Sequence, residues 1–324
     1  MDENNSTVRF IIIGAGKMGL YHGLALKACK NAELVGVVSR STESAKKLAQ
    51  ELSISVYGNN LEEICSKTKP HACIVAVSHF VTSKVLGECI ELGLHVLVEK
   101  PVSIDSEIIT ALNIQAKAKG VNIMVAVNRR FYKVIQSAYL DTQFFGGLKS
   151  IVVSGNDHPN YYKLRKSFTN DVYDYWPLMN TIHVFDLISF FSKGIKELVF
   201  STSSINGQEQ VIQSIILGNN GSSTTFSYAE GSGNLNGWSI MLNGKDLQTI
   251  ISPMEKTELT FSFSGLSKEI NKENSIFKEG LFEQLNFFIN SVKHGIPISF
   301  PACNLEEHAN VISNMSRIFK LNHV

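Results

Sequence analysis

The sequence predicts an α/β protein that begins with a doubly wound parallel sheet and continues into an α/β domain with a large, mostly antiparallel open sheet. From residue 8 to residue 127, short apolar runs alternate with segments of helical spacing, a pattern typical of parallel sheets. Beyond residue 128, longer alternating segments are separated by Asn-Gly and Gly-Lys-Asp turns, which favour antiparallel pairing. We therefore expect two domains, residues 1–127 and 128–324, with a ligand in the crevice at the carboxyl ends of the parallel strands.

The first strand and helix enclose a glycine-rich turn. Phe10 to Ile13 form an apolar run suited to a strand buried on both faces, and helical spacing begins at Leu20. Between them, Gly-Ala-Gly-Lys-Met-Gly fits G-x-G-x-x-G, whose glycines permit a tight turn, close approach of a pyrophosphate, and helix–strand packing. Because a helix N-terminus also attracts phosphate, we predict dinucleotide contacts at Gly14, Gly16, Lys17, Met18 and Gly19.

The remaining helices and strands are predicted from the spacing of apolar residues and from the residues that cap or end helices. Ser41 or Thr42, and Asp105 or Ser106, are suited to cap helices, and Gly93 and Gly120 to end them. In the first domain we expect strands at 33–39, 56–57, 72–77, 95–99 and 121–127, and helices at 43–52, 61–67, 81–92 and 106–119. In the second we expect helices at 130–139, 180–191, 282–292 and 306–321, a loop at 157–176, and strands at 149–154, 197–204, 211–217, 223–229, 238–242, 247–251 and 258–263.

Composition narrows the classes of partner and compartment. Lys and Arg number 30 against 29 Asp and Glu, and no basic arm occurs, which argues against a nucleic-acid partner. The apolar runs are too short to cross a membrane, and residues 1–7 lack the features of a secretory signal. Five cysteines without a C-x-x-C pair indicate free thiols, and no His/Cys spacing indicates a metal. We expect a soluble cytoplasmic protein.

The end of the second predicted strand bears on the choice of dinucleotide. A carboxylate about 20 residues after the glycines would bind the ribose 2′-hydroxyl of NAD, but this position reads Ser39-Arg40-Ser41. An arginine attracts a 2′-phosphate and two hydroxyls can hydrogen-bond it, so NADP(H) is favoured over NAD(H). The alternative is that Arg40 is an ordinary solvated charge and either cofactor serves.

A charged pair follows the fifth predicted strand, in Glu99-Lys100-Pro101. Beside a nicotinamide, Lys100 could hold or protonate a carbonyl oxygen, and partial desolvation would lower its pKa toward working pH. Taken alone, however, Lys100 is better explained as a surface charge at a strand end.

The order of motifs along the chain resembles the glucose–fructose oxidoreductase / inositol dehydrogenase / MocA family. The glycine-rich turn, Glu-Lys-Pro, Asn128-Arg-Arg-Phe, a helix with His183 and Asp186, and a closing Phe282-Glu-Gln-Leu-Asn-Phe-Phe carry the resemblance. It implies a Rossmann domain, an open-sheet domain that commonly makes the subunit contact, a cis peptide before the proline, and NAD(P)-dependent redox chemistry on sugars or cyclitols. We also place Ser78, His79, Glu99, Lys100 and Asn128 among the cofactor contacts, although the family usually has a Thr-Pro-Asn-like turn at Ser78-His79.

With the resemblance, His183 becomes the candidate acid/base and Asp186 its partner, because a spacing of three residues places both on one helical face. The alternative is a pair that only tethers the domains. Family dehydrogenases often carry an Asp four residues before this histidine, where this chain has Met179. That departure weakens the case for a cyclitol or simple aldose dehydrogenase.

The loop before this helix adds basic and aromatic groups. Lys163, Arg165 and Lys166 could grip a phosphate or carboxylate, and Tyr161 or Tyr162 could stack on a sugar or base; the alternative is a solvated loop. The predicted substrate contacts are Lys100, Arg130, Tyr161, Lys163, Arg165, Asn180 and His183.

The sequence thus predicts an NADP-preferring oxidoreductase acting on a CH–OH group of a sugar or sugar-derived alcohol or ketone, including nucleotide-linked or acidic sugars. We expect a homodimer or homotetramer through the C-terminal sheet. The competing hypothesis is a regulator or sensor of the same fold that binds the cofactor without catalysis.

Overall fold

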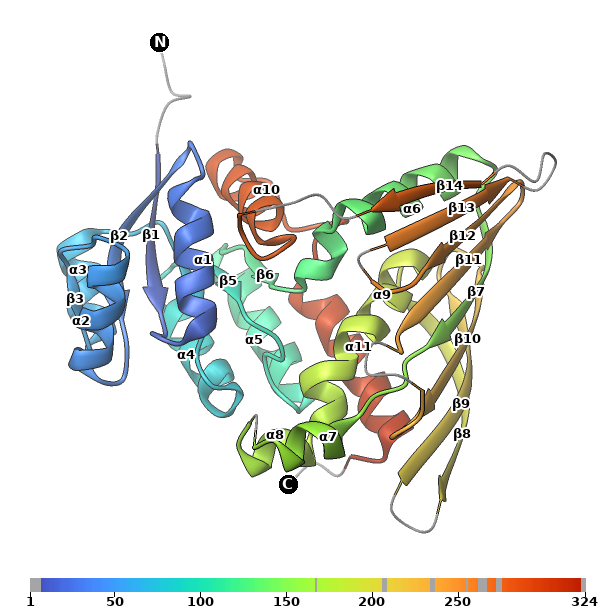
Figure 1. The fold of residues 1–324 in the computed structure, drawn as a ribbon. Coiled ribbons are helices and arrows are strands. Elements are labelled where there is room, and N and C mark those ends of the chain that lie inside the picture. Colours follow the sequence, from blue (N-terminus) through green and yellow to red (C-terminus); the bar gives the residue numbers. More distant parts are fainter. Residues whose placement is uncertain are drawn as a thin grey trace. The chain divides into compact units, whose positions relative to one another are not determined.

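The computed structural model describes residues 7–166, 168–205, 209–233, 237–254, 256–261, 267–271 and 276–321. Its contacts divide the chain into two units (Figure 1). Unit 1 comprises Met1–Phe131 with Ser275–Ala309, and unit 2 comprises Tyr132–Asn274 with Asn310–Val324. Outside the described residues lie positions 1–6 of the N-terminal segment 1–7, the Asn-Gly turn at 206–207 and the last two residues of the strand predicted at 258–263.

Unit 1 is built on a six-stranded sheet in the order β3-β2-β1-β4-β5-β6, with every neighbouring pair parallel. The strands are β1 (Val8–Ile13), β2 (Ala32–Val38), β3 (Tyr57–Gly58), β4 (Ala72–Val75), β5 (His95–Val98) and β6 (Ile123–Val125). The order turns outward in both directions from β1 and β4, so the doubly wound parallel sheet is confirmed. In sheets of this kind ligands bind outside the carboxyl ends of the strands, at the point where the order reverses.

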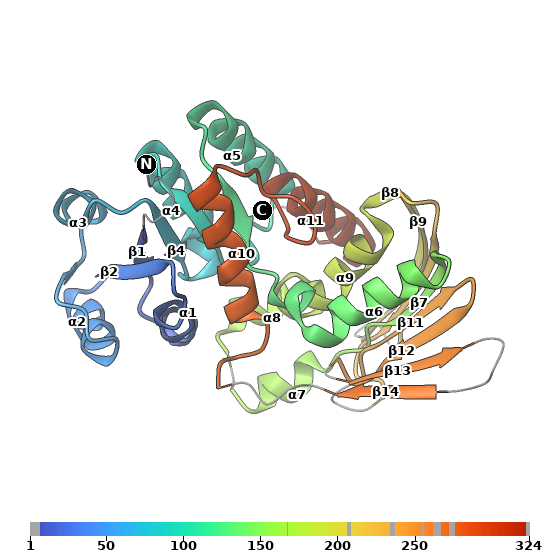
Figure 2. The same cartoon turned by 90° about the horizontal axis from the view of Figure 1, so that it is seen from above.

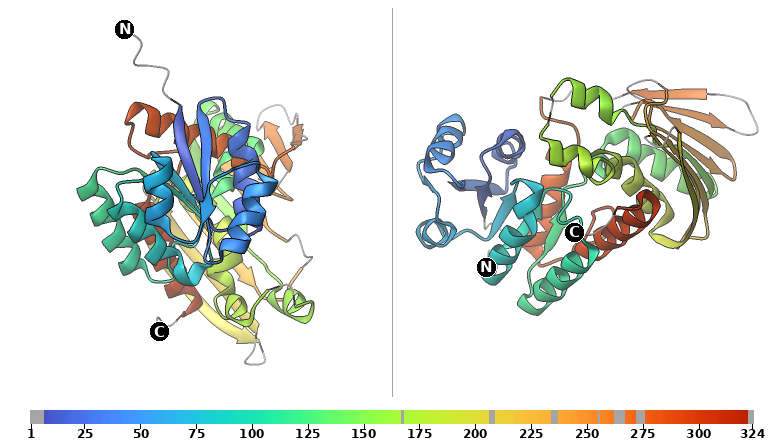
Figure 3. Two further views of the ribbon diagram at one scale, coloured as in Figure 1. Left: turned by 90° about the vertical axis from the view of Figure 1, so that its left-hand side faces the viewer. Right: turned by 90° about the horizontal axis from the view of Figure 1, so that it is seen from below.

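Helices cover both faces of this sheet (Figures 2 and 3). On one face lie α1 (Lys17–Lys27), α2 (Thr42–Glu51) and α10 (Leu281–His294), and on the other α3 (Leu61–Thr68), α4 (His79–Glu91) and α5 (Ser106–Lys119). Phe10 and Ile12 of β1 pack with Leu26, Leu48 and Phe288 from the three helices of the first face. The rings of Phe10 and Phe288 meet edge to face, with centroids 6.1 Å apart.

The predicted helix caps are confirmed by the backbone. The Ser41 hydroxyl accepts from the Ser44 N–H at 3.4 Å, and Asp105 accepts from the Glu107 N–H at 2.8 Å. Gly120 follows α5 with φ of +66°, the left-handed conformation that ends a helix at little cost for glycine.

The division into units differs from the predicted single boundary at residue 127. Residues 275–309 return to unit 1, where α10 packs on β1 and α1. The spacing of apolar residues predicts that a helix packs on an apolar surface, but it does not identify that surface. The sequence therefore could not show that α10 packs on unit 1.

Unit 2 contains an eight-stranded sheet in the order β14-β13-β12-β11-β7-β10-β9-β8. Only the β7–β10 pair is parallel among these neighbours, so the mostly antiparallel open sheet is confirmed. The strands are β7 (Leu148–Ser154), β8 (Ile195–Ile205), β9 (Glu209–Gly218), β10 (Ser223–Ala229), β11 (Ser239–Gly244), β12 (Leu247–Ile251), β13 (Lys256–Phe261) and β14 (Ser267–Asn271).

The helical segments of unit 2 depart from prediction in two places. The expected loop at 157–176 contains two short helices, α7 (Pro159–Leu164) and α8 (Asn170–Asp174). The expected helix from residue 180 begins as a π-helical turn, η2 (Pro177–Thr181), and continues as α9 (Ile182–Ser192). A 3-10 turn, η1 (Asn128–Phe131), precedes α6 (Lys133–Phe144), and α11 (Leu305–Phe319) runs from unit 1 into unit 2.

One face of the unit 2 sheet is covered by helices and the other carries exposed apolar side chains. Phe185 of α9 packs edge to face on Phe226 of β10, and Tyr139 of α6 on Phe190 of α9. Cross-strand register places a row of residues on the opposite face: Val199, Ile215, Thr225, Val152 and Met241. Three of them, Val199, Ile215 and Val152, are between 46% and 65% exposed.

No helix among the described residues is long and apolar enough to cross a membrane. Four of the five cysteines are buried and none forms a disulfide within this structure, as expected for small apolar side chains; Cys65 is half-buried.

Candidate active site

The glycine-rich turn of unit 1 joins β1 to α1 in the predicted way. Gly14 has φ of +112°, and a Cβ there would lie 2.2 Å from the Ala76 carbonyl oxygen. A Cβ on Gly19 would lie 2.1 Å from the Gly14 oxygen, so only glycine lets α1 start this close to the strand end. At Gly16 a Cβ would meet nothing within 4 Å, which leaves open space where a ligand can approach the backbone.

The start of α1 is suited to an anion. Gly16 caps the helix without a side-chain hydrogen bond, and the first turn contains no acidic residue. The N–H groups and positive end of the helix dipole are therefore not neutralised by the helix itself. The open position at Gly16 and this helix end together fit the pyrophosphate of a dinucleotide.

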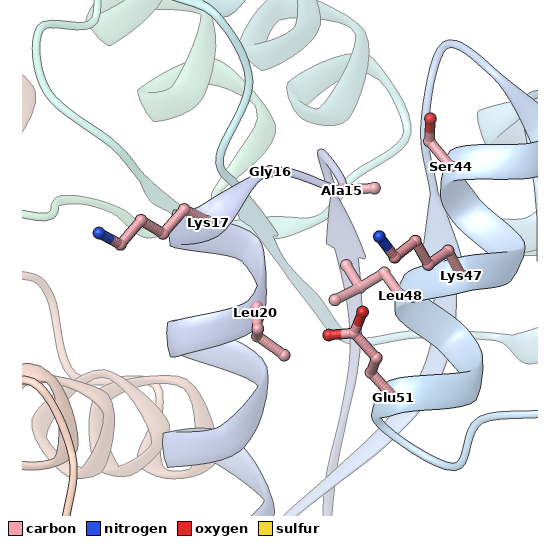
Figure 4. Close-up of a pocket in the computed structure, with 8 residues that line it drawn as sticks. All are labelled: Ala15, Gly16, Lys17, Leu20, Ser44, Lys47, Leu48 and Glu51. Atoms are coloured by element: carbon pink, nitrogen blue, oxygen red, sulfur yellow. The ribbon is translucent and has the colours of Figure 1, made fainter. Parts of the chain in front are cut away.

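A pocket of about 310 Å³ lies beside this turn, between α1 and α2 (Figure 4). It is lined by Ala15, Gly16, Lys17, Leu20, Ser44, Lys47, Leu48 and Glu51. In Figure 4 the Lys47 ammonium group points toward the Ala15 side of the turn, whereas Lys17 extends away from the pocket. The exposed Arg40, at the end of β2, precedes the α2 cap at Ser41. Two basic side chains therefore belong to this region, Lys47 on α2 and Arg40 just before α2.

Ser78 and His79 follow β4 at the same edge of the sheet. Ser78 precedes α4 as its N-cap residue, and its carbonyl accepts from the Thr82 hydroxyl at 3.1 Å. The His79 ring lies against Phe80, with centroids 4.0 Å apart. Their predicted contact with the cofactor stays a prediction.

Glu99, directly after β5, is hydrogen-bonded to a histidine that sequence reasoning missed. The Nε2 of His22, a fully buried residue of α1, lies 2.8 Å from Glu99 Oε1. Burial acts to raise the pKa of Glu99, but the bond from His22 and the charges of His22, Lys100 and Lys278 outweigh it, so that pKa lies below its usual value. The signal in the sequence was weak, since a histidine three residues beyond the last glycine is also a common core residue.

Lys100 is half-buried at the same edge and precedes a cis peptide to Pro101, as the resemblance implied. Burial lowers the pKa of Lys100 to about 8; Glu99 opposes this, and the like charges of Lys278 and Arg129 add to it. A lysine with this pKa exchanges a proton near neutral pH, which an ordinary lysine does not.

The two arginines after β6 have different surroundings. Arg130, predicted to contact substrate, is fully buried, and its Nη1 donates to the Ala302 carbonyl at 3.2 Å and to Glu307 at 3.1 Å. This burial weighs against the substrate contact, which stays a prediction. Arg129 is half-buried and close enough to Lys100 to lower its pKa, so the neighbouring arginine is the one in the electrostatic surroundings of the lysine.

Asn128 is also buried, and its amide donates to the Glu279 carbonyl at 2.8 Å. The residue thus holds the segment before α10, and the cofactor contact predicted for it stays a prediction.

In unit 2, His183 lies in the first turn of α9, directly after the π-helical turn, and Asp186 lies three residues on. His183 is half-buried and Asp186 is buried. Local π-helical geometry frequently marks functional positions in helices. The catalytic roles of both residues stay predictions.

Asn180, on the same π-helical turn, has a buried partner that the sequence did not suggest. Its amide donates to Asp157 Oδ2 at 2.8 Å, and the Thr181 hydroxyl donates to the same oxygen at 3.1 Å. Asp157 is 5% exposed and also accepts from the His158 N–H at 2.9 Å. A carboxylate after β7 therefore fixes the turn that carries Asn180.

The basic and aromatic loop has a core of its own. Tyr162 stacks on Trp176 with centroids 5.2 Å apart, and Tyr173 stacks on the same indole at 5.7 Å. The Arg165 guanidinium lies 4.4 Å from the centre of the Tyr161 ring. Lys163 and Arg165 are exposed and available to an anion, and their substrate contacts stay predictions.

Fold and site together define a dinucleotide-binding α/β protein with a lysine of lowered pKa at the carboxyl edge of its parallel sheet. Residues 8–127 match the model of the GFO_IDH_MocA family, described as "Oxidoreductase family, NAD-binding Rossmann fold". This match over the dinucleotide-binding domain confirms the resemblance inferred from the motifs.

Individual proteins agree with the match. Inositol 2-dehydrogenase from Rhizobium meliloti (strain 1021) is 24% identical over 192 residues, covering 57% of this chain and 54% of the relative. A dehydrogenase from Chromobacterium violaceum has the same fold, with a TM-score of 0.82 and 15% identity over 98% of this chain and 95% of that one. UDP-N-acetylglucosamine 3-dehydrogenase from Acidithiobacillus ferrooxidans gives a TM-score of 0.77 and 16% identity over 97% of each chain. The chain spans about half the length of the curated relatives it matches.

The lowered pKa of Lys100 predicts a pH-dependent stability in the absence of ligand. Between about 8 and the ordinary value of 10.5 the unfolded chain holds more protons than the folded one, so this lysine makes the free energy of unfolding rise with pH over that window. We expect Lys100→Met to be more stable than wild type at pH 7 by on the order of 1–2 kcal/mol, and the difference to shrink toward pH 10.

Urea unfolding at both pH values measures this difference, with Lys30→Met, a change at an exposed lysine of unit 1, as the control. A difference between wild type and Lys100→Met that stays constant with pH would contradict the lowered pKa.

Proposed function

We propose that the protein is an NAD(P)-dependent dehydrogenase that prefers NADP(H) and acts on a CH–OH group of a sugar or sugar-derived substrate, including nucleotide-linked or acidic sugars. The observation that carries the proposal is Lys100, half-buried with a pKa of about 8 after β5, at the carboxyl edge of the parallel sheet. The relatives named above act, by their names, on inositol and on a nucleotide-linked sugar, which supports this substrate class.

In the proposed reaction, the bound nicotinamide supplies or accepts the hydride. The glycine-rich turn and the start of α1 hold the pyrophosphate, and the Lys100 ammonium group donates a hydrogen bond to the substrate oxygen. During reduction the oxygen takes a proton from Lys100 or His183, and during oxidation it returns one. Glu99 provides a negative charge next to Lys100, and the hydrogen bond from His22 favours the ionised form of Glu99.

The proposed preference for NADP(H) rests on the groups around the end of β2. Arg40, Ser39 and Ser41 are the groups that a 2′-phosphate would meet there, and no carboxylate stands in the sequence Ser-Arg-Ser. Lys47, which lines the pocket between α1 and α2, adds a second cation, partly offset by Glu51.

The proposed partner is a second copy of the chain, through the open face of the unit 2 sheet. The row of Val199, Ile215, Thr225, Val152 and Met241 is mostly apolar, and isolated proteins rarely leave such a row in water. In a symmetric dimer the same apolar row of a second copy would pack against this row and remove both from water.

The second candidate function is a sensor that binds the dinucleotide without turnover. Met179 favours it, because this residue stands where dehydrogenases of the family often have a substrate-binding Asp. Lys100 speaks against it, since binding alone needs no group that exchanges a proton near pH 8.

Lys100→Met should lower kcat by at least about 100-fold while NADPH binding is retained, because general acid–base assistance is worth that much. The measurement is NADPH oxidation on a panel of keto-sugars, inosose, nucleotide-linked sugars and acidic sugars, with binding followed by NADPH fluorescence. Lys30→Met should keep full turnover. Full activity of Lys100→Met would remove this lysine from the mechanism, and binding without turnover on the whole panel by wild type would favour the sensor.

Arg40→Gln should weaken NADPH about tenfold, the cost of one charge-assisted hydrogen bond, and leave NADH unchanged. Lys47→Gln should act in the same direction. Lys46→Gln, a change at the exposed neighbour that does not line the pocket, is the matched control. Titration calorimetry with both cofactors checks this, and an equal loss for NADPH and NADH would refute a 2′-phosphate site.

Ile215→Lys should dissociate the oligomer, because a charge in the middle of the apolar row must lose water when two rows meet. Light scattering coupled to size exclusion measures the mass. Leu140→Lys, at an equally exposed position of α6, should leave the mass of wild type unchanged. If Ile215→Lys keeps the wild-type mass, the sheet face is not the contact.

A further inference from the structure

We propose that Lys278, just before α10, is an additional ligand of the dinucleotide pyrophosphate. This inference rests on the proposed function, because it names a further contact at the same site. Neither the motifs nor the family model, which ends at residue 127, includes this residue.

Lys278 reaches the glycine-rich turn from a distant part of the chain within unit 1. Its Nζ lies 3.6 Å from the Sδ of Met18, the residue before the last glycine of the motif. A thioether is a weak acceptor, so this contact leaves most of the donor capacity of the ammonium group for another partner. Because the pyrophosphate lies at the start of α1, the position next to Met18 is where a phosphate oxygen would accept from Lys278.

The backbone around Lys278 is anchored on both sides. The Phe277 ring stacks on Phe282, with centroids 5.8 Å apart, and the Glu279 carbonyl accepts from the Asn128 amide at 2.8 Å. The Lys278 carbonyl itself accepts from the Leu281 N–H at 3.2 Å, at the start of α10. A long side chain on a fixed backbone loses less freedom when it binds a ligand than one on a mobile loop.

Positive charge is concentrated around this position. Lys278 is close enough to Lys17 and Arg129 for both to lower its pKa, after partial loss of hydration as the largest cause, while Glu99 opposes them. Lys278 in turn lowers the pKa of Lys100. Like charges gathered beside Glu99 repel one another, and a doubly charged pyrophosphate relieves that repulsion. Lys278 is solvent-exposed, so a ligand can reach it.

The alternative ligand for Lys278 is the substrate. The contact with Met18 favours the pyrophosphate, because Met18 belongs to the turn that holds the dinucleotide and not to the end of β5 where the substrate would meet Lys100. A substrate contact would leave binding of a substrate-free probe unchanged, which separates the two.

The test compares wild type, Lys278→Met and Lys278→Arg by titration calorimetry with adenosine diphosphate ribose, which contains the pyrophosphate but lacks the nicotinamide. Lys278→Met should bind this probe at least about tenfold more weakly, the loss expected for one hydrogen bond between charged groups. The loss should diminish at high salt, and Lys278→Arg should restore most of the affinity. Lys30→Met is the control for removal of an exposed lysine, and thermal unfolding verifies that each variant is folded.

A second readout reports on the charge cluster. Removal of Lys278 takes away a like charge, so the pH at which Lys100 titrates should move above its value of about 8 in Lys278→Met. Equal affinity of wild type and Lys278→Met for adenosine diphosphate ribose overturns this inference alone. If wild type binds neither the probe nor NADPH or NADH, the proposed function fails with it.

Discussion

The hydrogen bond between His22 and Glu99 joins the two parts of unit 1 on which the site depends. His22 belongs to the helix that begins at the glycine-rich turn, and Glu99 follows β5 and precedes Lys100. Burying a carboxylate is costly unless it is hydrogen-bonded, and this bond offsets that cost. An ionised Glu99 in turn limits how far burial and nearby cations lower the pKa of Lys100. The helix α1, which begins at the glycine-rich turn, and the candidate catalytic Lys100 are thus linked through His22 and Glu99.

Most of the fold could be predicted from local sequence patterns. The caps at Ser41 and Asp105 and the stop at Gly120 could be predicted because each depends on neighbours within a few residues. The return of residues 275–309 to unit 1 could not, because the partner of α10, Phe10, lies far away in the sequence. The helices within 157–176 were missed since their stability depends on the stacking of Tyr162 and Tyr173 on Trp176, which is tertiary rather than local.

For the site, sequence motifs identify the candidate positions, but only the packing shows which of two adjacent residues lies near Lys100. The pattern Asn-Arg-Arg-Phe offered two arginines, and only the structure separates the buried Arg130 from Arg129, which acts on Lys100. His22, Asp157 and Lys278 were missed because each acts through a partner remote in the chain: Glu99, Asn180 and Met18. The glycines were predictable because their requirement is steric and falls on the backbone itself.

The return of the chain to unit 1 also has a consequence for how the protein is made. During synthesis the strands β1 to β6 emerge first, but the helix that covers Phe10 and Ile12 is translated only after all of the unit 2 sheet. Until then that face of the parallel sheet has α1 and α2 but lacks α10, and exposed apolar surface of this kind makes a partly folded chain prone to aggregation. Unit 1 therefore cannot complete its core before the strands of the unit 2 sheet have been translated.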